Sequence, residues 1–205
     1  LGYTPQASDA VVGDGGQAAF NQTWGAGKEL GLTVSYEGIK AGFYGAEREN
    51  KTSNNTVTGG RTIGDEFNGA WYVKYSMGPV SIGYSETYLD GGVTQGLSSE
   101  KTTASKAERT AGGIFTGEQM SIAFNVNDNM SISYTTSEET YDTQDDAKTA
   151  TTNDDDVTES IDAIQVAYSM GGMSIKAYNM EVSNPDQDDN AADQSITEIA
   201  LGFAF

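Results

Sequence analysis

The chain of 205 residues contains no cysteine and no histidine, and each absence excludes whole classes of site. Without cysteine there are no disulfides, thiolate metal sites or cysteine nucleophiles. Without histidine there are no serine–histidine triads and no histidine-ligated zinc sites. The sequence also shows no nucleophile elbow and no glycine loop for binding phosphate. It therefore predicts no enzymatic activity.

Basic residues are scarce: 11 Lys and Arg stand against 30 Asp and Glu, which gives a formal net charge of -19. Nucleic-acid binding needs basic patches, so the acidic excess argues against it. It argues equally against docking on anionic lipid. Two interpretations of the charge stay open, since the acidic residues either keep the protein soluble or take part in ion selection.

Long hydrophobic runs are also missing. Only 37% of the residues are hydrophobic and the mean hydropathy is -0.47. No run approaches the ~18 apolar residues of a membrane helix, but a membrane β-strand needs only ~9–11 residues, half of them apolar. The sequence opens on Leu1 without a signal peptide, so we expect a mature, truncated or cytosolic chain.

The clearest pattern that is present lies in the last stretch, QSITEIALGFAF. Its alternate residues form two sets: Phe205, Phe203, Leu201 and Ile199 on one face, and Ala204, Gly202, Ala200 and Glu198 on the other. Period-two alternation predicts a strand between two different environments. A soluble sandwich would bury the apolar face, whereas a membrane barrel would turn it to lipid. Ending on Phe after an alternating strand resembles the C-terminal assembly signal of bacterial outer-membrane proteins.

Similar alternation recurs along the chain between two kinds of connection. Short turns are predicted at Glu37-Gly38, Gly78-Pro79, Asn127 to Asn129 and Gly171-Gly172. Long polar loops are predicted at 6–27, 49–66, 89–113, 137–160 and 183–193. With an incomplete first strand at 1–5, this gives about ten strands, and unequal connections at the two ends are typical of membrane barrels. We expect an all-β, antiparallel transmembrane β-barrel that forms one domain over residues 1–205.

Several tyrosines lie close to the predicted short turns: Tyr36, Tyr75, Tyr84, Tyr134 and Tyr168. In a membrane barrel they would form an interfacial aromatic girdle. In a soluble protein they would instead make aromatic cross-strand pairs in the core.

Two related hairpin units and the chain ending carry a family resemblance. WYVKYSMGPVSIGYSETY (71–88), IQVAYSMGGMSIKAYNME (164–181) and the final ITEIALGFAF resemble general diffusion porins of the alphaproteobacterial, Gram-negative type. The resemblance implies passive diffusion of ions and small hydrophilic solutes through a homotrimer in the outer membrane. Such barrels have about 16 strands, so we expect this chain to be the C-terminal part of a longer porin. The opening LGYTP resembles the strand end after the porin constriction loop.

Charged residues opposite the apolar faces are the candidate pore-lining residues: Lys40, Arg48, Lys74, Lys176 and Glu198. In the porins that the chain resembles, a basic wall faces acidic groups on the constriction loop and creates a transverse field. Our hypothesis is that Lys74 and Lys176 form such a wall at similar depth, with Lys40 lower and Arg48 higher. The alternative is that inward charges only keep the lumen wet.

The acidic loops contain a candidate calcium site at Asp186, Asp188 and Asn190, whose spacing resembles that of a calcium loop. Ala191 stands where glycine is expected, and no Glu occupies the position of the bidentate ligand. A solvated, cation-attracting mouth is the alternative. No other cofactor is expected.

Two other functions remain open. One is a small closed outer-membrane barrel with a structural or adhesive role, and the other is a soluble exported β-domain that binds a ligand through its acidic loops. The predicted inward faces are rich in Gly, Ala and Ser, which fill a small lumen poorly. This favours the wider, open barrel.

Overall fold

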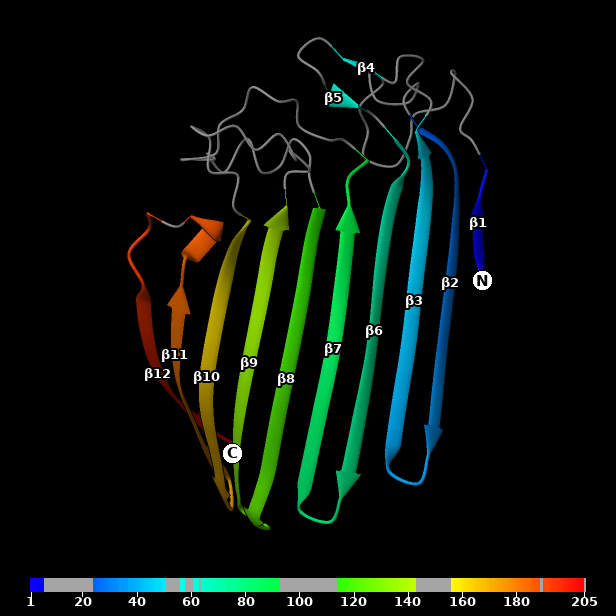
Figure 1. Cartoon of the computed structure of the whole chain (residues 1–205). Helices are drawn as coiled ribbons and strands as arrows, with labels where there is room; N and C mark the ends of the chain where they lie inside the picture. Colours follow the sequence, from blue (N-terminus) through cyan, green and yellow to red (C-terminus); the bar gives the residue numbers. More distant parts are fainter. Residues whose placement is uncertain are drawn as a thin grey trace.

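The computed structural model describes residues 1–5, 24–50, 56–57, 61–62, 64–92, 114–142, 156–188 and 190–204. These residues form one ten-stranded antiparallel sheet and a separate two-stranded hairpin (Figure 1). The all-β antiparallel fold class predicted from the sequence is therefore confirmed. Within the described residues, no helix is long and apolar enough to cross a membrane.

The strands of the large sheet follow one another in chain order. They are β1 (Gly2–Thr4), β2 (Trp24–Tyr36), β3 (Ile39–Asn50), β6 (Glu66–Met77), β7 (Val80–Asp90), β8 (Ile114–Asn127), β9 (Met130–Asp142), β10 (Val157–Met170), β11 (Met173–Ser183) and β12 (Gln194–Phe203). The hairpin consists of β4 (Thr56–Val57) and β5 (Arg61–Thr62), and a short 3-10 helix, η2 (Pro185–Gln187), follows β11. Each strand of the large sheet is hydrogen-bonded to the next, so the sheet is a meander.

The sheet is open, with β1 at one edge and β12 at the other (Figure 1). The three residues of β1 pair only with Gly27 to Glu29 of β2. Beyond them, Leu30 to Tyr36 pair with β3 alone among the described strands. The lower half of β2 is therefore an exposed sheet edge.

Short turns join the strands at one end of the sheet, as the sequence predicts. Glu37 and Gly38 both have positive φ, 44° and 86°, which is the signature of a type I′ hairpin turn. Gly78 and Gly171 each take positive φ at the first turn position. At the third turn, the side chain of Asn127 accepts a 2.9 Å hydrogen bond from the backbone N–H of Asn129. The strand ends that the longer connections join all lie at the opposite end of the sheet (Figure 1).

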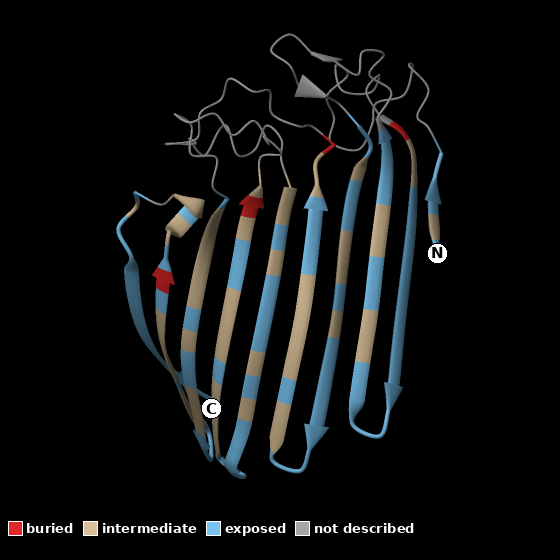
Figure 2. Cartoon of the chain, in the orientation of Figure 1, coloured by how far each residue is buried: buried red, intermediate tan, exposed pale blue. Residues whose placement is uncertain are grey.

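The cross-strand register gives the sheet two unlike faces. We call the apolar face the one that carries Val34, Val73 and Ile122, and the polar face the one that carries Ser35, Lys74 and Ser121. Most large hydrophobic side chains that are exposed lie on the apolar face. Tyr141 and Val182 are the only buried hydrophobic residues among those described (Figure 2). Neither face is covered by a second layer in the described part of the chain, so the sheet has no conventional core.

Several strands extend further toward the long connections than predicted. β2 begins at Trp24 instead of Lys28, β9 ends at Asp142 instead of Thr136, and β10 begins at Val157 instead of Ile161. In the extensions of β9 and β10, Ser, Thr and Glu occupy both faces, and the extension of β2 contains Gly25, Ala26 and Gly27 after Trp24. The hydrophobic period therefore disappears while the backbone ladder continues. The hairpin β4–β5 and η2 were also assigned to loops, because none of them contains a repeating apolar pattern.

Gly38 and Gly171 form a matched pair for testing the turns. A Cβ added at Gly38 would lie 2.5 Å from the backbone oxygen of Ser76, whereas one added at Gly171 would meet nothing within 4 Å. Both alanine variants carry the cost of a left-handed residue, but only Gly38→Ala must also displace β6. We expect it to lower the free energy of unfolding by about 1–2 kcal/mol more than Gly171→Ala. Urea denaturation followed by far-ultraviolet circular dichroism measures the difference, and equal losses would contradict the turn geometry.

Candidate functional site

The apolar face carries a belt of large side chains whose position shifts steadily from strand to strand. On β2 the belt begins at Leu30, and on β12 its corresponding member is Ile199. The row of cross-strand partners through Leu30 meets β7 at Tyr88. The row through Ile199 meets β7 at Val80, eight residues nearer the short turns. The belt therefore descends across the sheet.

The slope of the belt can be estimated from standard strand dimensions. Eight residues correspond to ~27 Å along a strand, and the eight steps from β2 to β12 correspond to ~38 Å across the sheet. These lengths give an angle of about 35° between the belt and the cross-strand direction. Strands of membrane barrels are tilted by about 35–45°, so a belt that is level in a bilayer must slope across its strands by that angle.

The predicted tyrosine girdle is divided between the two borders of this belt. Tyr134 is the uppermost large side chain of the apolar face on β9, and on β7 Tyr84 lies below Glu86 with Tyr88 above it. Tyr36, Tyr75 and Tyr168 lie within two residues of the short turns. The interfacial girdle stays a prediction, and the strand register places its five tyrosines at two different heights.

Acidic side chains follow the upper border of the belt, one on each of five successive strands. We call them the acidic line: Glu86, Glu118, Glu138, Asp162 and Glu181. The first three are direct cross-strand neighbours. Glu86 accepts hydrogen bonds from Trp71 Nε1 at 2.9 Å and from Tyr84 Oη at 2.7 Å. Tyr134 Oη donates to Asp162 at 2.5 Å. The tyrosine and tryptophan rings thus connect the apolar belt to the carboxylates above it.

All five predicted pore-lining residues share the polar face. Lys40 and Lys74 are direct cross-strand partners. The cross-strand partners of Lys176 lead across the sheet to Asn125 on β8, and those of Lys74 lead to Ser121 on the same strand. Measured along β8, Lys176 therefore lies four residues nearer the short turns than Lys74. Over the five steps from β6 to β11 the belt descends by about the same amount, so Lys74 and Lys176 lie at similar depth relative to the belt. Lys40 is the cross-strand partner of Lys74, so the two lysines lie at nearly the same height.

Other polar-face groups surround these lysines. Glu198 accepts a 3.1 Å hydrogen bond from Tyr178 Oη and lies diagonally across from Lys176. Arg48 is paired across the ladder with Glu66, eight residues from Lys40 along β3. Small residues separate the charges, since Lys176 lies between Ala167 and Ala200. Such a wall can attract and orient ions, but it brings together no nucleophile and base.

An apolar cluster that was not predicted from the sequence lies on the polar face near the long connections. The rings of Phe115 and Tyr141 lie 4.7 Å apart, and Tyr141 is 3% exposed. Beside them, backbone N–H of Asp186 donates to Glu159 at 2.5 Å, and the side-chain amide of Gln187 donates to Glu139 at 2.7 Å. The segment 184–188 therefore folds onto the polar-face side of β9 and β10. Counting alternate residues onward from Thr136 puts Tyr141 on the polar face, but no hydrophobic contrast marks a strand there.

The candidate calcium residues lie in and after this segment. Asp188 Oδ1 accepts a 3.0 Å hydrogen bond from the backbone N–H of Asn190, which closes a turn. Asp186 follows a left-handed Asn184 and itself has φ 62°. Among the described residues, no three acidic side chains are arranged to hold a metal ion. The calcium site stays a prediction, and much of the predicted acidic loop 137–160 lies outside the described residues.

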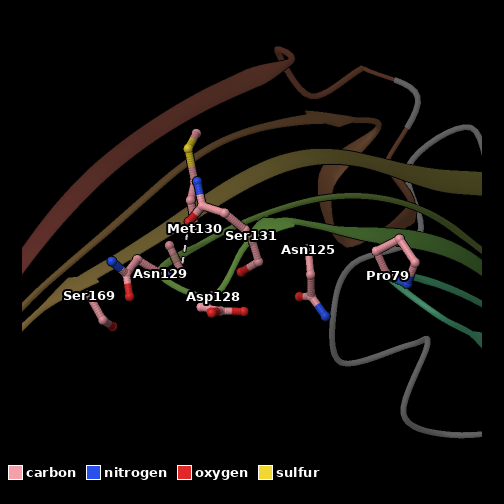
Figure 3. A pocket seen from close by; sticks show the side chains of 9 residues that line it. Pro79, Asn125, Asp128, Asn129, Met130, Ser131 and Ser169 are labelled. Atoms are coloured by element: carbon pink, nitrogen blue, oxygen red, sulfur yellow. Dashed lines mark hydrogen bonds between the residues drawn. The ribbon is translucent and has the colours of Figure 1, made fainter.

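A polar hollow of about 500 Å³ lies at the short-turn end of the sheet (Figure 3). Asn125, Asp128, Ser131 and Ser169 line it together with Pro79. Its walls offer amide, hydroxyl and carboxylate oxygens but no basic side chain. This composition indicates a hydrated rim of the polar face.

The chain was also compared with known proteins. No protein-family model matches it, and a search of curated proteins finds no match. Its fold and surfaces are therefore interpreted from its own residues.

The bond between Asp186 and Glu159 can be tested by hydrogen exchange. A hydrogen bond to a carboxylate contributes about 1.5–3 kcal/mol, so Glu159→Ala should speed exchange of the Asp186 amide by about tenfold or more. Glu181→Ala removes a carboxylate from the neighbouring strand on the other face and should leave the rate unchanged. Mass spectrometry of the peptide that covers 184–188 gives both rates. Equal exchange in the two variants would contradict the fold of this segment.

Proposed function

We propose that this chain forms the wall of a porin, a passive, water-filled channel in the outer membrane of a Gram-negative bacterium. The observation that carries the proposal is the sloping apolar belt. A level hydrocarbon layer crossed by strands tilted by about 35° produces that slope, and the belt is exposed in the sheet. The porin-like hairpins 71–88 and 164–181 supply two parts of this belt, which β8 and β9 separate.

The polar face supports the same proposal as the lumen wall. Its positions include Gly42, Ser85, Ser121 and Ala163, which are too small to fill a barrel interior. Lys40, Lys74 and Lys176 project from this wall at similar depth. Size limits which solutes pass, and the lysines shape the electrostatic potential of the narrow zone.

The open edges of the sheet require further pairing in such a channel. Leu30 to Tyr36 of β2 carry belt residues, and unpaired backbone groups are not tolerated in hydrocarbon. We propose that further strands join β2 and β12 in a barrel of about 16 strands, as in the porins that the sequence resembles. The homotrimer implied by that resemblance is part of the same proposal.

The charge of the chain adds a bias at the channel mouth. The net charge of -19 raises the local concentration of cations, and Glu139 and Glu159 lie on the polar face near the long connections. The lysines lie deeper, between this mouth and the short turns. Solutes would thus meet a negative potential first and a positive wall second.

Adjacent residues of β9 test which face meets lipid. Ser133 lies on the polar face and Ile132 on the apolar face, and the chain has no cysteine of its own. In lipid vesicles, we expect a charged, water-soluble thiol reagent to modify Ser133→Cys at least about tenfold faster than Ile132→Cys, because the reagent must leave water to reach the latter. In urea both should react alike. Equal rates in vesicles would overturn the membrane assignment.

The lysine wall is tested by comparing two equal charge reversals. Lys74→Glu changes the lumen wall, whereas Lys28→Glu changes an apolar-face lysine whose Nζ lies 3.9 Å from Glu47. In planar bilayers under a salt gradient, Lys74→Glu should raise the cation-to-anion permeability ratio by roughly threefold, through Coulomb attraction at the narrow zone. Lys28→Glu should leave the reversal potential almost unchanged. Identical reversal potentials in the native chain and both variants would remove Lys74 from the ion path.

A further inference from the structure

The apolar face contains a hollow directly below the acidic line. Its volume is about 350 Å³, which falls within the ~300–1,000 Å³ typical of small-molecule sites. Val73, Ile82, Met120 and Ile122 line it. The rings of Tyr84 and Tyr134 complete its wall, so the hollow presents almost no polar group to an occupant.

Carboxylates lie next to the hollow on its side toward the long connections. Tyr84 and Met120 are cross-strand partners, and the next row toward the long connections contains Glu86, Glu118 and Glu138. Both carboxylate oxygens of Glu86 already accept hydrogen bonds, from Trp71 and Tyr84. Tyr84 also interacts with Glu118, but Glu118 and Glu138 keep carboxylate oxygens that can accept from a ligand above the hollow.

Within the strands that the structure describes around the hollow, basic side chains lie on the opposite face from this row. Among the described side chains of β6 to β12, the lysines are Lys74 and Lys176, and both lie on the polar face. In the described part of the chain, the charges beside the hollow on its own face are thus negative. An anionic headgroup would be repelled there, whereas a positive headgroup would be attracted.

We propose that the hollow binds one acyl chain of a membrane lipid whose headgroup carries an ammonium group, and that this group lies against Glu118 and Glu138. The inference rests on the proposed function, since only a membrane-embedded chain presents this face to lipid. The apolar hollow takes the hydrocarbon, and the two carboxylates select the charge of the headgroup. Tyr84 and Tyr134 lie at the junction of the two, where an amphipathic ring suits both environments.

Trp71 provides a reporter beside the hollow, because its ring lies 5.4 Å from that of Tyr84. Trp24→Phe leaves it as the only tryptophan of the two in the chain. The protein is placed in vesicles of phosphatidylethanolamine and phosphatidylglycerol in equal amounts, with brominated chains on one lipid or on the other. The composition is the same in both samples, so any difference in quenching reports lipid preference.

We expect brominated phosphatidylethanolamine to contact Trp71 with about fivefold preference over brominated phosphatidylglycerol, as two exposed charge pairs allow. Glu118→Gln combined with Glu138→Gln should bring the ratio close to 1. The control, Glu139→Gln combined with Glu198→Gln, removes the same charge from the polar face and should keep the preference.

The other outcomes separate this inference from the proposed function. Equal quenching by both lipids in the native chain would overturn the headgroup preference while leaving the channel intact. Quenching by neither would overturn both proposals, because Trp71 would then lie outside the lipid. A preference for phosphatidylglycerol that needs Mg²⁺ and disappears with a chelator would replace the ammonium group by a cation-bridged anionic headgroup.

Discussion

The register of the β-ladder is the constraint on which every surface of this protein depends. Side chains alternate between faces with a period of two, so a slip of one residue exchanges the faces completely. Such a slip on β6 would put Lys74 in place of Val73 within the apolar belt. The four short turns fix the register locally, and the positive φ values of Glu37, Gly38 and Gly171 fit hairpin turns that match the twist of the strands.

The two faces of the sheet suit different environments, and a bilayer around a water-filled channel provides both. The apolar face needs a cover, and the polar face with its lysines needs water. The carboxylates of the acidic line limit how deeply the belt can lie in the bilayer, because placing an ionised group in hydrocarbon costs free energy. Trp71 and Tyr84 lie at this limit and donate to Glu86 from rings that belong to the belt. Their amphipathic shape is suited to an interface between hydrocarbon and water.

The sequence was sufficient to predict the ten strands of the large sheet, the short turns that join them and the assignment of residues to the two faces. Lys40, Lys74 and Lys176 could be placed on the polar face because apolar neighbours such as Val73 and Ile175 alternate with them. The upper ends of β9 and β10 could not be predicted, since Ser137 to Asp142 lack hydrophobic contrast. The slope of the belt required the pairing between strands, which no single strand contains. The folded segment 184–188 depends on contacts with Glu139 and Glu159, which are distant in the chain.

Polarised infrared spectroscopy of the protein in oriented bilayers tests the central claim most directly. The dichroism of the amide I band gives the mean angle between the strands and the membrane normal. The sloping belt predicts an angle of about 35°, within the error of the standard strand spacings. Strands with no preferred orientation, or strands lying close to the membrane plane, would contradict the assignment of the belt to the hydrocarbon layer.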